Sequence, residues 1–180
     1  EQRWADGKLD RLAAFAAELV RLKMDIIVSA GPTVTRVLRK ITSTIPIVMG
    51  FDDDPVGSGF VASLARPGGN ITGLSTLSPE LSAKQLELLK EILPKISRVA
   101  VLGSSAHPGT SQTLKEMKST STAFGVQIQY IELQGPNDIE SAFSAARKGH
   151  ADAVVVLTSV VTNSNRKPIV DIAAKNRLPA

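Results

Sequence analysis

The chain has 180 residues, of which 43% are hydrophobic and 21% are charged, and this composition excludes an intrinsically disordered protein. The formal net charge is +4, but the basic residues are spread singly and only 4% of residues are aromatic, so no nucleic-acid-binding surface is predicted. The chain has no cysteine, which excludes disulfides, thiolate nucleophiles and cysteine-bound metals.

Short apolar runs alternate with amphipathic stretches through the first half of the chain. The spacing of apolar residues predicts a helix over residues 9–20, and the apolar run 25–28 that follows is typical of a strand buried on both faces. Residues 60–64 predict a short helix. The glycine pattern in 57–62 is interpreted as its flexible entry, because a nucleotide-binding motif would follow its strand directly. Strands are predicted near residues 25–30, 45–50 and 71–75.

The second half repeats this style, with strands predicted near residues 98–102, 126–133 and 152–157. Polar and apolar residues alternate over 126–130, which indicates a strand near the edge of a sheet. The stretch from Asp25 to Pro46 is echoed from Asp152 to Pro179, since each passes through a strand and a helix to a Pro-marked strand start. All β-α-β units share this order, so the echo has two interpretations: a true repeat, or a common pattern.

Strands that alternate with helices predict an α/β fold with parallel sheets and helices on both faces. We expect two Rossmann-like lobes, lobe one over residues 1–75 and lobe two over 76–180, with the boundary near residues 73–80. Right-handed connections bring the loops after parallel strands to one edge of each sheet, where ligands bind in such folds.

The loops that follow each strand therefore supply the candidate ligand-binding residues. The free N–H groups of a helix starting near Thr33 suit an anionic group such as a carboxylate. Asp52 or Asp54 is a candidate partner for an ammonium group. The full set comprises Gly31, Pro32, Thr33, Asp52, Asp54, Thr72, Ser75, Ser104, Ser105, Thr158 and Ser159.

The most concentrated charge in the chain is Asp52-Asp53-Asp54. Three interpretations stay open for it: a turn or cap, a contact to a ligand amine, and a metal site, although hard cations need ligands from several directions. His107 and His150 are far apart in sequence and predict surface roles. No catalytic residue, metal or cofactor is predicted, because no acid, base or nucleophile set converges.

Several stretches resemble the substrate-binding proteins of ABC transporters, in the group specific for tryptophan and aromatic amino acids. The most specific is Leu64–Ser75, and shorter ones lie at Arg3–Lys8, Ala16–Val20, Thr44–Val48, Asp54–Gly57 and Glu80–Lys84. The resemblance covers essentially the whole chain. It implies the type I periplasmic-binding-protein fold, with a ligand, an amino acid or similar zwitterion, in a cleft between the lobes.

The resemblance also implies export through a leader upstream of residue 1, a periplasmic or extracellular location, and permease subunits in the membrane as partners. It implies that the sequence is truncated at both ends. We expect exposed strand edges to be compensated by association into a homodimer. The alternative function is the effector-sensing domain of a transcription regulator, which shares this fold; an enzyme is disfavoured.

Overall fold

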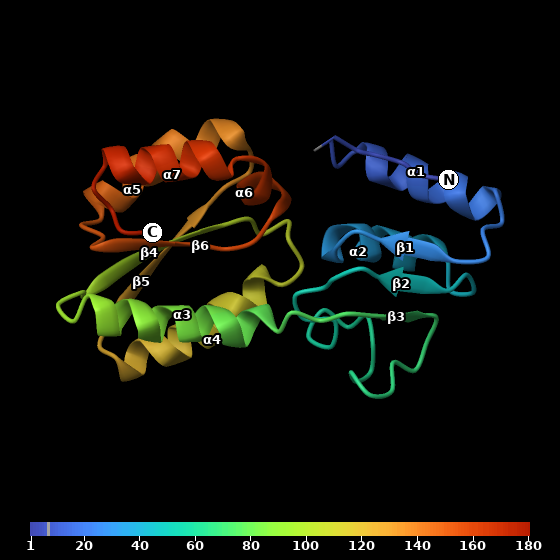
Figure 1. Ribbon diagram of the computed structural model, residues 1–180, viewed down its shortest axis with the longest axis horizontal. Helices are drawn as coiled ribbons and strands as arrows, with labels where there is room; N and C mark the ends of the chain where they lie inside the picture. Colours follow the sequence, from blue (N-terminus) through green and yellow to red (C-terminus); the bar gives the residue numbers. More distant parts are fainter. Residues whose placement is uncertain (7) are drawn as a thin grey trace. The chain divides into compact units, whose positions relative to one another are not determined.

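The computed structural model describes residues 1–6 and 8–180 and divides into two compact units, Glu1–Ser78 and Pro79–Ala180. Each unit has its own three-stranded sheet with all strands parallel, so the predicted α/β fold class is confirmed (Figure 1). Unit 1 contains α1 (Arg11–Arg21), β1 (Ile27–Ser29), α2 (Pro32–Ile41), β2 (Ile47–Met49) and β3 (Ile71–Gly73).

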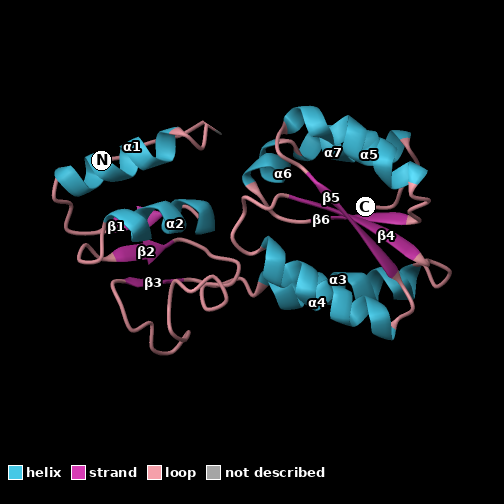
Figure 2. Ribbon diagram, turned by 180° about the vertical axis from the view of Figure 1, so that it is seen from behind, coloured by secondary structure: helices cyan, strands magenta, loops and turns pink. Residues whose placement is uncertain are grey.

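The sheet of unit 1 has the order β1-β2-β3, and its core lies on one face. Ile27, Ile47 and Ile71 are aligned in register across the three strands, and all are buried. Helix α2 packs against β1 and β2, and α1 packs on α2 (Figure 2). Because side chains alternate between the two faces of a strand, these three isoleucines form an apolar row that faces the helices.

The opposite face of this sheet is not covered by a helix of unit 1. Val28, predicted to be buried, is 68% exposed, and its register partners Val48 and Thr72 are half-buried and exposed. The expectation of helices on both faces is therefore wrong for the described part of unit 1. The second face is bare because α1 and α2, which precede β1 and β2, both lie on the same side of the sheet.

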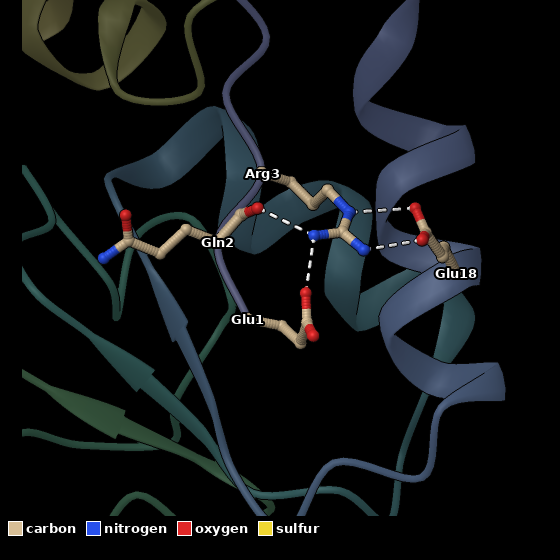
Figure 3. Close-up of polar contacts among 4 residues, drawn as sticks. All are labelled: Glu1, Gln2, Arg3 and Glu18. Carbon is tan, nitrogen blue, oxygen red and sulfur yellow. Dashed lines mark hydrogen bonds and ion pairs between the residues drawn. The ribbon is translucent and has the colours of Figure 1, made fainter.

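The first residues of the chain are fastened to α1 by one arginine (Figure 3). Arg3 Nη2 lies 2.6 Å from Glu18 Oε1 and Arg3 Nε lies 3.0 Å from Oε2, a two-pronged contact that suits a planar guanidinium. A third contact joins Arg3 to Glu1. The hydrogen bond from Arg3 lowers the pKa of Glu18, so the pair stays charged at neutral pH. Within the stretch Arg3–Lys8, Arg3 thus connects the start of the chain to α1.

The predicted helix over residues 60–64 is absent, and turns occupy this part of the described chain. Gly59 has φ +70°, which a helix does not accommodate, and Phe60 N–H donates to Pro55 O as part of a compact turn. Phe60 and Val61 are nevertheless buried in the unit 1 core. Leu64 is exposed, and the spacing of these apolar residues was misread as helical.

Unit 2 is a three-layer sandwich around a sheet of order β5-β4-β6. One face packs against α5 and α7 and the other against α3 and α4, so helices cover both faces, as predicted (Figure 1). Its elements are α3 (Ser78–Ile92), β4 (Arg98–Gly103), α4 (Thr110–Ala123), β5 (Gln127–Glu132), a 3₁₀ turn (Pro136–Asp138), α5 (Ile139–Lys148), β6 (Ala153–Val156), α6 (Val160–Ser164) and α7 (Arg166–Lys175).

Successive side chains of β4 alternate between the two hydrophobic clusters of unit 2. Ala100 and Leu102 face the cluster built by α5 and α7, and Val99 and Val101 face the other cluster. β5 has only one strand neighbour and is half-buried along most of its length, which confirms the predicted edge strand.

The echo between the two halves extends to individual hydrogen bonds. Ile27 N–H donates to Pro46 O at 2.9 Å, and Val154 N–H donates to Pro179 O at 2.7 Å. In both cases the donor lies two residues after an aspartate, and the acceptor is the proline that follows the helix. Pro179 therefore lies beside β6 as Pro46 lies beside β1, which supports the interpretation as a repeat.

Asp152 joins the amino ends of β4 and β6, and its removal is expected to lower stability in a pH-dependent way. Its Oδ2 accepts hydrogen bonds from Ser97 N at 2.7 Å and Arg98 N at 2.9 Å, which lower the pKa of the carboxyl group below its usual 3.8. The native state therefore gains stability from the ionised form, and this gain is lost as pH falls through the native pKa.

We expect Asp152→Asn to cost about 1 kcal/mol at pH 7, the low end for a charged acceptor because Asp152 is exposed. Urea unfolding at pH 7 and at about pH 2.5 measures the difference, which should shrink at the lower pH because less of the wild-type carboxyl is then ionised. Asp171→Asn, which breaks a surface contact to Lys167, is the control with little effect at either pH. A pH-independent difference contradicts this role for Asp152.

Candidate functional site

The carboxyl ends of β1, β2 and β3 lie at one edge of the unit 1 sheet because the strands are parallel and in register. Seven predicted residues belong to this half. Six of them lie beyond this edge, whereas Thr72 lies inside β3, exposed and paired with Val48. Pro32 and Thr33 form the first turn of α2, and the other four lie in the loops: Gly31, Asp52, Asp54 and Ser75.

Helix α2 begins at this edge, with Gly31 as its N-cap. Gly31 has φ +118°, and a β-carbon there would lie 2.8 Å from the ring of Phe51, so glycine is required for two reasons. The N–H groups of Val34 and Thr35 both donate to Gly31 O. Pro32 has no N–H group. The backbone N–H of Thr33 is therefore the amide of the first turn that suits an anionic group. The side chain of Thr33 is half-buried.

Phe51 was not identified from the sequence. It follows β2 directly, its ring lies against Gly31, and it is 38% exposed. An aromatic residue immediately after a buried strand, in a chain with only 4% aromatic residues, is the signal that marks it. Its ring offers a flat apolar surface at the edge where ligands bind in parallel sheets.

The three aspartates serve the loop itself. Asp54 Oδ1 accepts from Gly57 N at 2.8 Å, and Asp52 Oδ1 accepts from Asp54 N at 3.1 Å. Asp53 Oδ1 accepts from Ser78 Oγ at 3.0 Å. Asp52 and Asp53 are buried, and Asp54 is half-buried. These bonds support the turn interpretation, while a ligand contact by Asp52 or Asp54 stays a prediction.

The same loop holds the segment that leaves unit 1. Thr76 N–H donates to Asp52 O at 2.8 Å, and Ser78 N–H donates to Asp53 O at 3.0 Å. Leu77 between them has φ +51°, an unfavourable value for a side chain with a β-carbon. The segment 76–78 is thus fixed by backbone hydrogen bonds to the loop at the carboxyl edge.

In unit 2 the carboxyl ends of β4, β5 and β6 also share one edge. Ser104 is buried, and its carbonyl accepts from Thr110 Oγ1 at 2.7 Å, which fixes the loop before α4. Ser159 is buried as the N-cap of α6, where its hydroxyl accepts from Thr162 N. Thr158 and Ser105 are exposed. The four predicted residues are brought to one edge, but only two of them present accessible side chains.

Glu132, the last residue of β5, was also missed. Its Oε1 accepts from Ser105 N at 2.8 Å and Ser105 Oγ at 3.0 Å, and its Oε2 accepts from Tyr130 Oη at 2.6 Å. The periodicity of β5 predicted an edge strand but not that its last side chain reaches the loop after β4. The bond to Glu132 and burial both raise the pKa of Tyr130, so the phenol stays protonated and donates.

A pocket of about 540 Å³ lies at the opposite, amino edge of the unit 2 sheet. Its walls are mainly apolar, with charged groups from Lys95, Asp152 and Arg177. Pro179, beside β6, forms part of the wall. It contains none of the predicted ligand-binding residues, so it provides a comparison site for locating a ligand by experiment.

Residues 1–6 and 8–180 contain neither a metal-binding cluster nor a membrane-spanning helix. No three His, Asp or Glu side chains there are placed to hold a metal ion, and the aspartate triple is no exception. No helix in this part of the chain combines the length and apolar character needed to span a membrane.

Three comparisons place the chain among known proteins. The family model described as "ABC transporter substrate binding protein" matches residues 1–180. A curated tyrosine-binding protein of Clostridioides difficile is 25% identical over 176 residues, which cover 97% of this chain and 50% of that protein. The chain thus spans about half the length of this curated relative.

Two solved structures are similar in fold. The ABC domain from Streptococcus pneumoniae in complex with L-Trp has a TM-score of 0.86 at 24% identity, covering 97% of this chain and 58% of that one. A conserved domain protein from Vibrio cholerae has a TM-score of 0.90 at 27% identity, covering 98% and 59%. The resemblance seen in the sequence is confirmed: the chain belongs to the ABC transporter substrate-binding protein family.

Proposed function

We propose that this chain is part of the solute-binding component of an ABC importer and binds an amino acid with an aromatic side chain. The ligand would contact the loops at the carboxyl edges of both sheets. The observation that carries the proposal is the match of the family model to every residue from 1 to 180. This match also favours a transport protein over the effector-sensing domain of a regulator.

The polar groups at the carboxyl edge of unit 2 suit binding without chemistry. Ser159 bonds to Thr162, Ser104 O to Thr110, and Ser105 to Glu132. These bonds fix the loops in place, whereas covalent catalysis needs a nucleophile held by a general base. Binding with no reaction is also what a substrate-binding family performs.

The choice of an aromatic amino acid has two supports. The curated relative from Clostridioides difficile is named a tyrosine-binding protein. In this chain, the half-exposed ring of Phe51 lies beside the start of α2, so one edge offers an aromatic surface and an anion-binding amide together. A ring and a carboxylate are the two groups that these features match.

The remaining parts of the proposal follow from this role. A solute-binding component works outside the cytoplasmic membrane, in the periplasm or extracellular space, and delivers its ligand to permease subunits in the membrane. No nucleic acid takes part. Association of two copies of the chain stays a prediction, for which the exposed apolar side chains on the bare face of the unit 1 sheet provide the reason.

Titration calorimetry of the purified protein with L-tyrosine and L-tryptophan tests the proposal. We expect saturable one-to-one binding of at least one of them, and a several-fold loss of affinity in Thr33→Ala, because a hydrogen-bonding side chain beside the α2 amides is removed. Thr44→Ala removes the same hydroxyl at the amino edge and should not change affinity. If Thr33→Ala and Asp54→Ala both bind as the wild type does, the site is misplaced.

A further inference from the structure

Glu132 is a half-buried carboxylate at the carboxyl edge of the unit 2 sheet, and three donors hold it in place. The donors come from Ser105, in the loop after β4, and from Tyr130, two residues earlier on the same face of β5. Because they approach from two elements, the position of the carboxylate is fixed before any ligand binds.

The carboxylate is ionised at neutral pH. Burial raises the pKa of Glu132, but the hydrogen bonds from Tyr130 and Ser105 outweigh this effect, and the pKa lies below its ordinary value. A carboxylate that accepts three hydrogen bonds still has about one of its roughly four acceptor positions left.

No cation of the described chain forms an ion pair with Glu132. Arg3, Arg11, Lys84 and Lys167 form ion pairs with other acidic residues. The carboxylate of Asp138 acts in the opposite sense to a countercharge, because it raises the pKa of Glu132. A half-buried anion without a countercharge is costly, and a cation that arrives with a ligand would reduce this cost.

We propose that Glu132 is the group that binds the ammonium of the ligand, and that Ser105 and Tyr130 position its carboxylate. The inference rests on the proposed function, which places the ligand at this edge. It assigns the ammonium to unit 2, where donors from two elements hold the carboxylate of Glu132 in place. The ligand class narrows accordingly to free amino acids and excludes carboxylic acids that lack an amino group.

The test compares L-tyrosine with 3-(4-hydroxyphenyl)propionate, which is the same molecule without its amino group. We expect the wild-type protein to prefer L-tyrosine, and Glu132→Gln to lower its affinity for L-tyrosine by about tenfold or more, since a charge-assisted hydrogen bond is lost. The affinity of Glu132→Gln for the analogue should equal that of the wild type. Glu140→Gln removes an exposed carboxylate from α5 and should change neither affinity.

Three results overturn the inference. If Glu132→Gln binds L-tyrosine as the wild type does, Glu132 does not contact the ammonium, and the proposed function still stands. If Glu132→Gln loses both ligands equally, the residue only holds the loop at Ser105. If the wild type binds neither L-tyrosine nor L-tryptophan, the proposed function fails and this inference fails with it.

The wild-type protein alone provides a second test should Glu132→Gln not fold, as judged by circular dichroism. Tyramine keeps the ring and ammonium of L-tyrosine but lacks its carboxylate. We expect tyramine to compete with L-tyrosine more strongly than 3-(4-hydroxyphenyl)propionate does. Equal affinities for L-tyrosine and 3-(4-hydroxyphenyl)propionate in the wild type contradict a role for any anionic ammonium partner.

Discussion

Replacing Gly73 by alanine is expected to lower the free energy of unfolding by about 3 kcal/mol. Gly73 is the last residue of β3 and has φ +146°, a value that residues with a β-carbon rarely adopt. A β-carbon at Gly73 would also overlap with the carbonyl oxygen of Met49 and lie 2.7 Å from its Cβ. Neither obstacle can be relieved by a side-chain rotation, because the first is the backbone angle of Gly73 itself and the second is the backbone of Met49 on the adjacent strand.

Urea unfolding followed by circular dichroism measures this loss. Gly69→Ala, in the same stretch Leu64–Ser75, is the matched control, because a β-carbon there meets nothing within 4 Å. It should change stability by less than about 1 kcal/mol. Equal effects of the two substitutions would show that the close approach of Gly73 to Met49 is unimportant, and would remove the structural explanation for this glycine.

Phe143→Ala is expected to cost about 3–5 kcal/mol, because it leaves a cavity in the core of unit 2. Phe143 lies on α5 and is completely buried among side chains of β4, β6 and α7. Close packing around a buried site allows only partial relaxation into such a cavity.

Hydrogen exchange measures this effect within unit 2, since the amides of β4 and β6 should exchange faster in the variant. Phe124→Ala removes the same side chain at the end of α4, where it is 40% exposed, and should cost only about 1 kcal/mol. An effect of Phe143→Ala no greater than that of Phe124→Ala contradicts the assignment of this core.

The sequence predicted the fold well because a parallel α/β arrangement depends on patterns that are local. Apolar runs or alternating patterns marked the six strands of the described residues, and the echo of Pro46 in Pro179 corresponds to two equivalent hydrogen bonds. The error at residues 60–64 has a local cause too. Apolar side chains there resemble a helix face, but Gly59 and the turn bonded to Pro55 prevent one.

The candidate site was predicted less completely because side-chain roles depend on contacts between distant segments. The rule that ligands bind at carboxyl edges selected loops that the structure brings to one edge of each sheet, and ligand binding there stays a prediction. It did not distinguish Ser159, which caps a helix, from Thr158, which is exposed. Phe51 and Glu132 were missed because their positions depend on Gly31 and Ser105, which are 20 and 27 residues away in the chain.

The bare face of the unit 1 sheet was also beyond local patterns. The run 25–28 contains only apolar residues after Asp25, and such a run predicts a strand buried on both faces. Whether a helix covers the second face of this strand depends on the path of the rest of the chain and not on the residues of the strand. Val28 is therefore exposed, although the apolar run to which it belongs predicts that it is buried.

Backbone hydrogen exchange with and without saturating L-tyrosine tests the central claim most directly, that a ligand binds at the carboxyl edges of the two sheets. We predict slower exchange in the loops that follow the strands, near residues 30–34, 50–54, 74–76, 104–107, 132–134 and 157–160. Exchange at residues 92–97, beside the pocket at the amino edge of unit 2, should not change. Protection confined to residues 92–97 and 176–179 would place the ligand in that pocket and contradict the account.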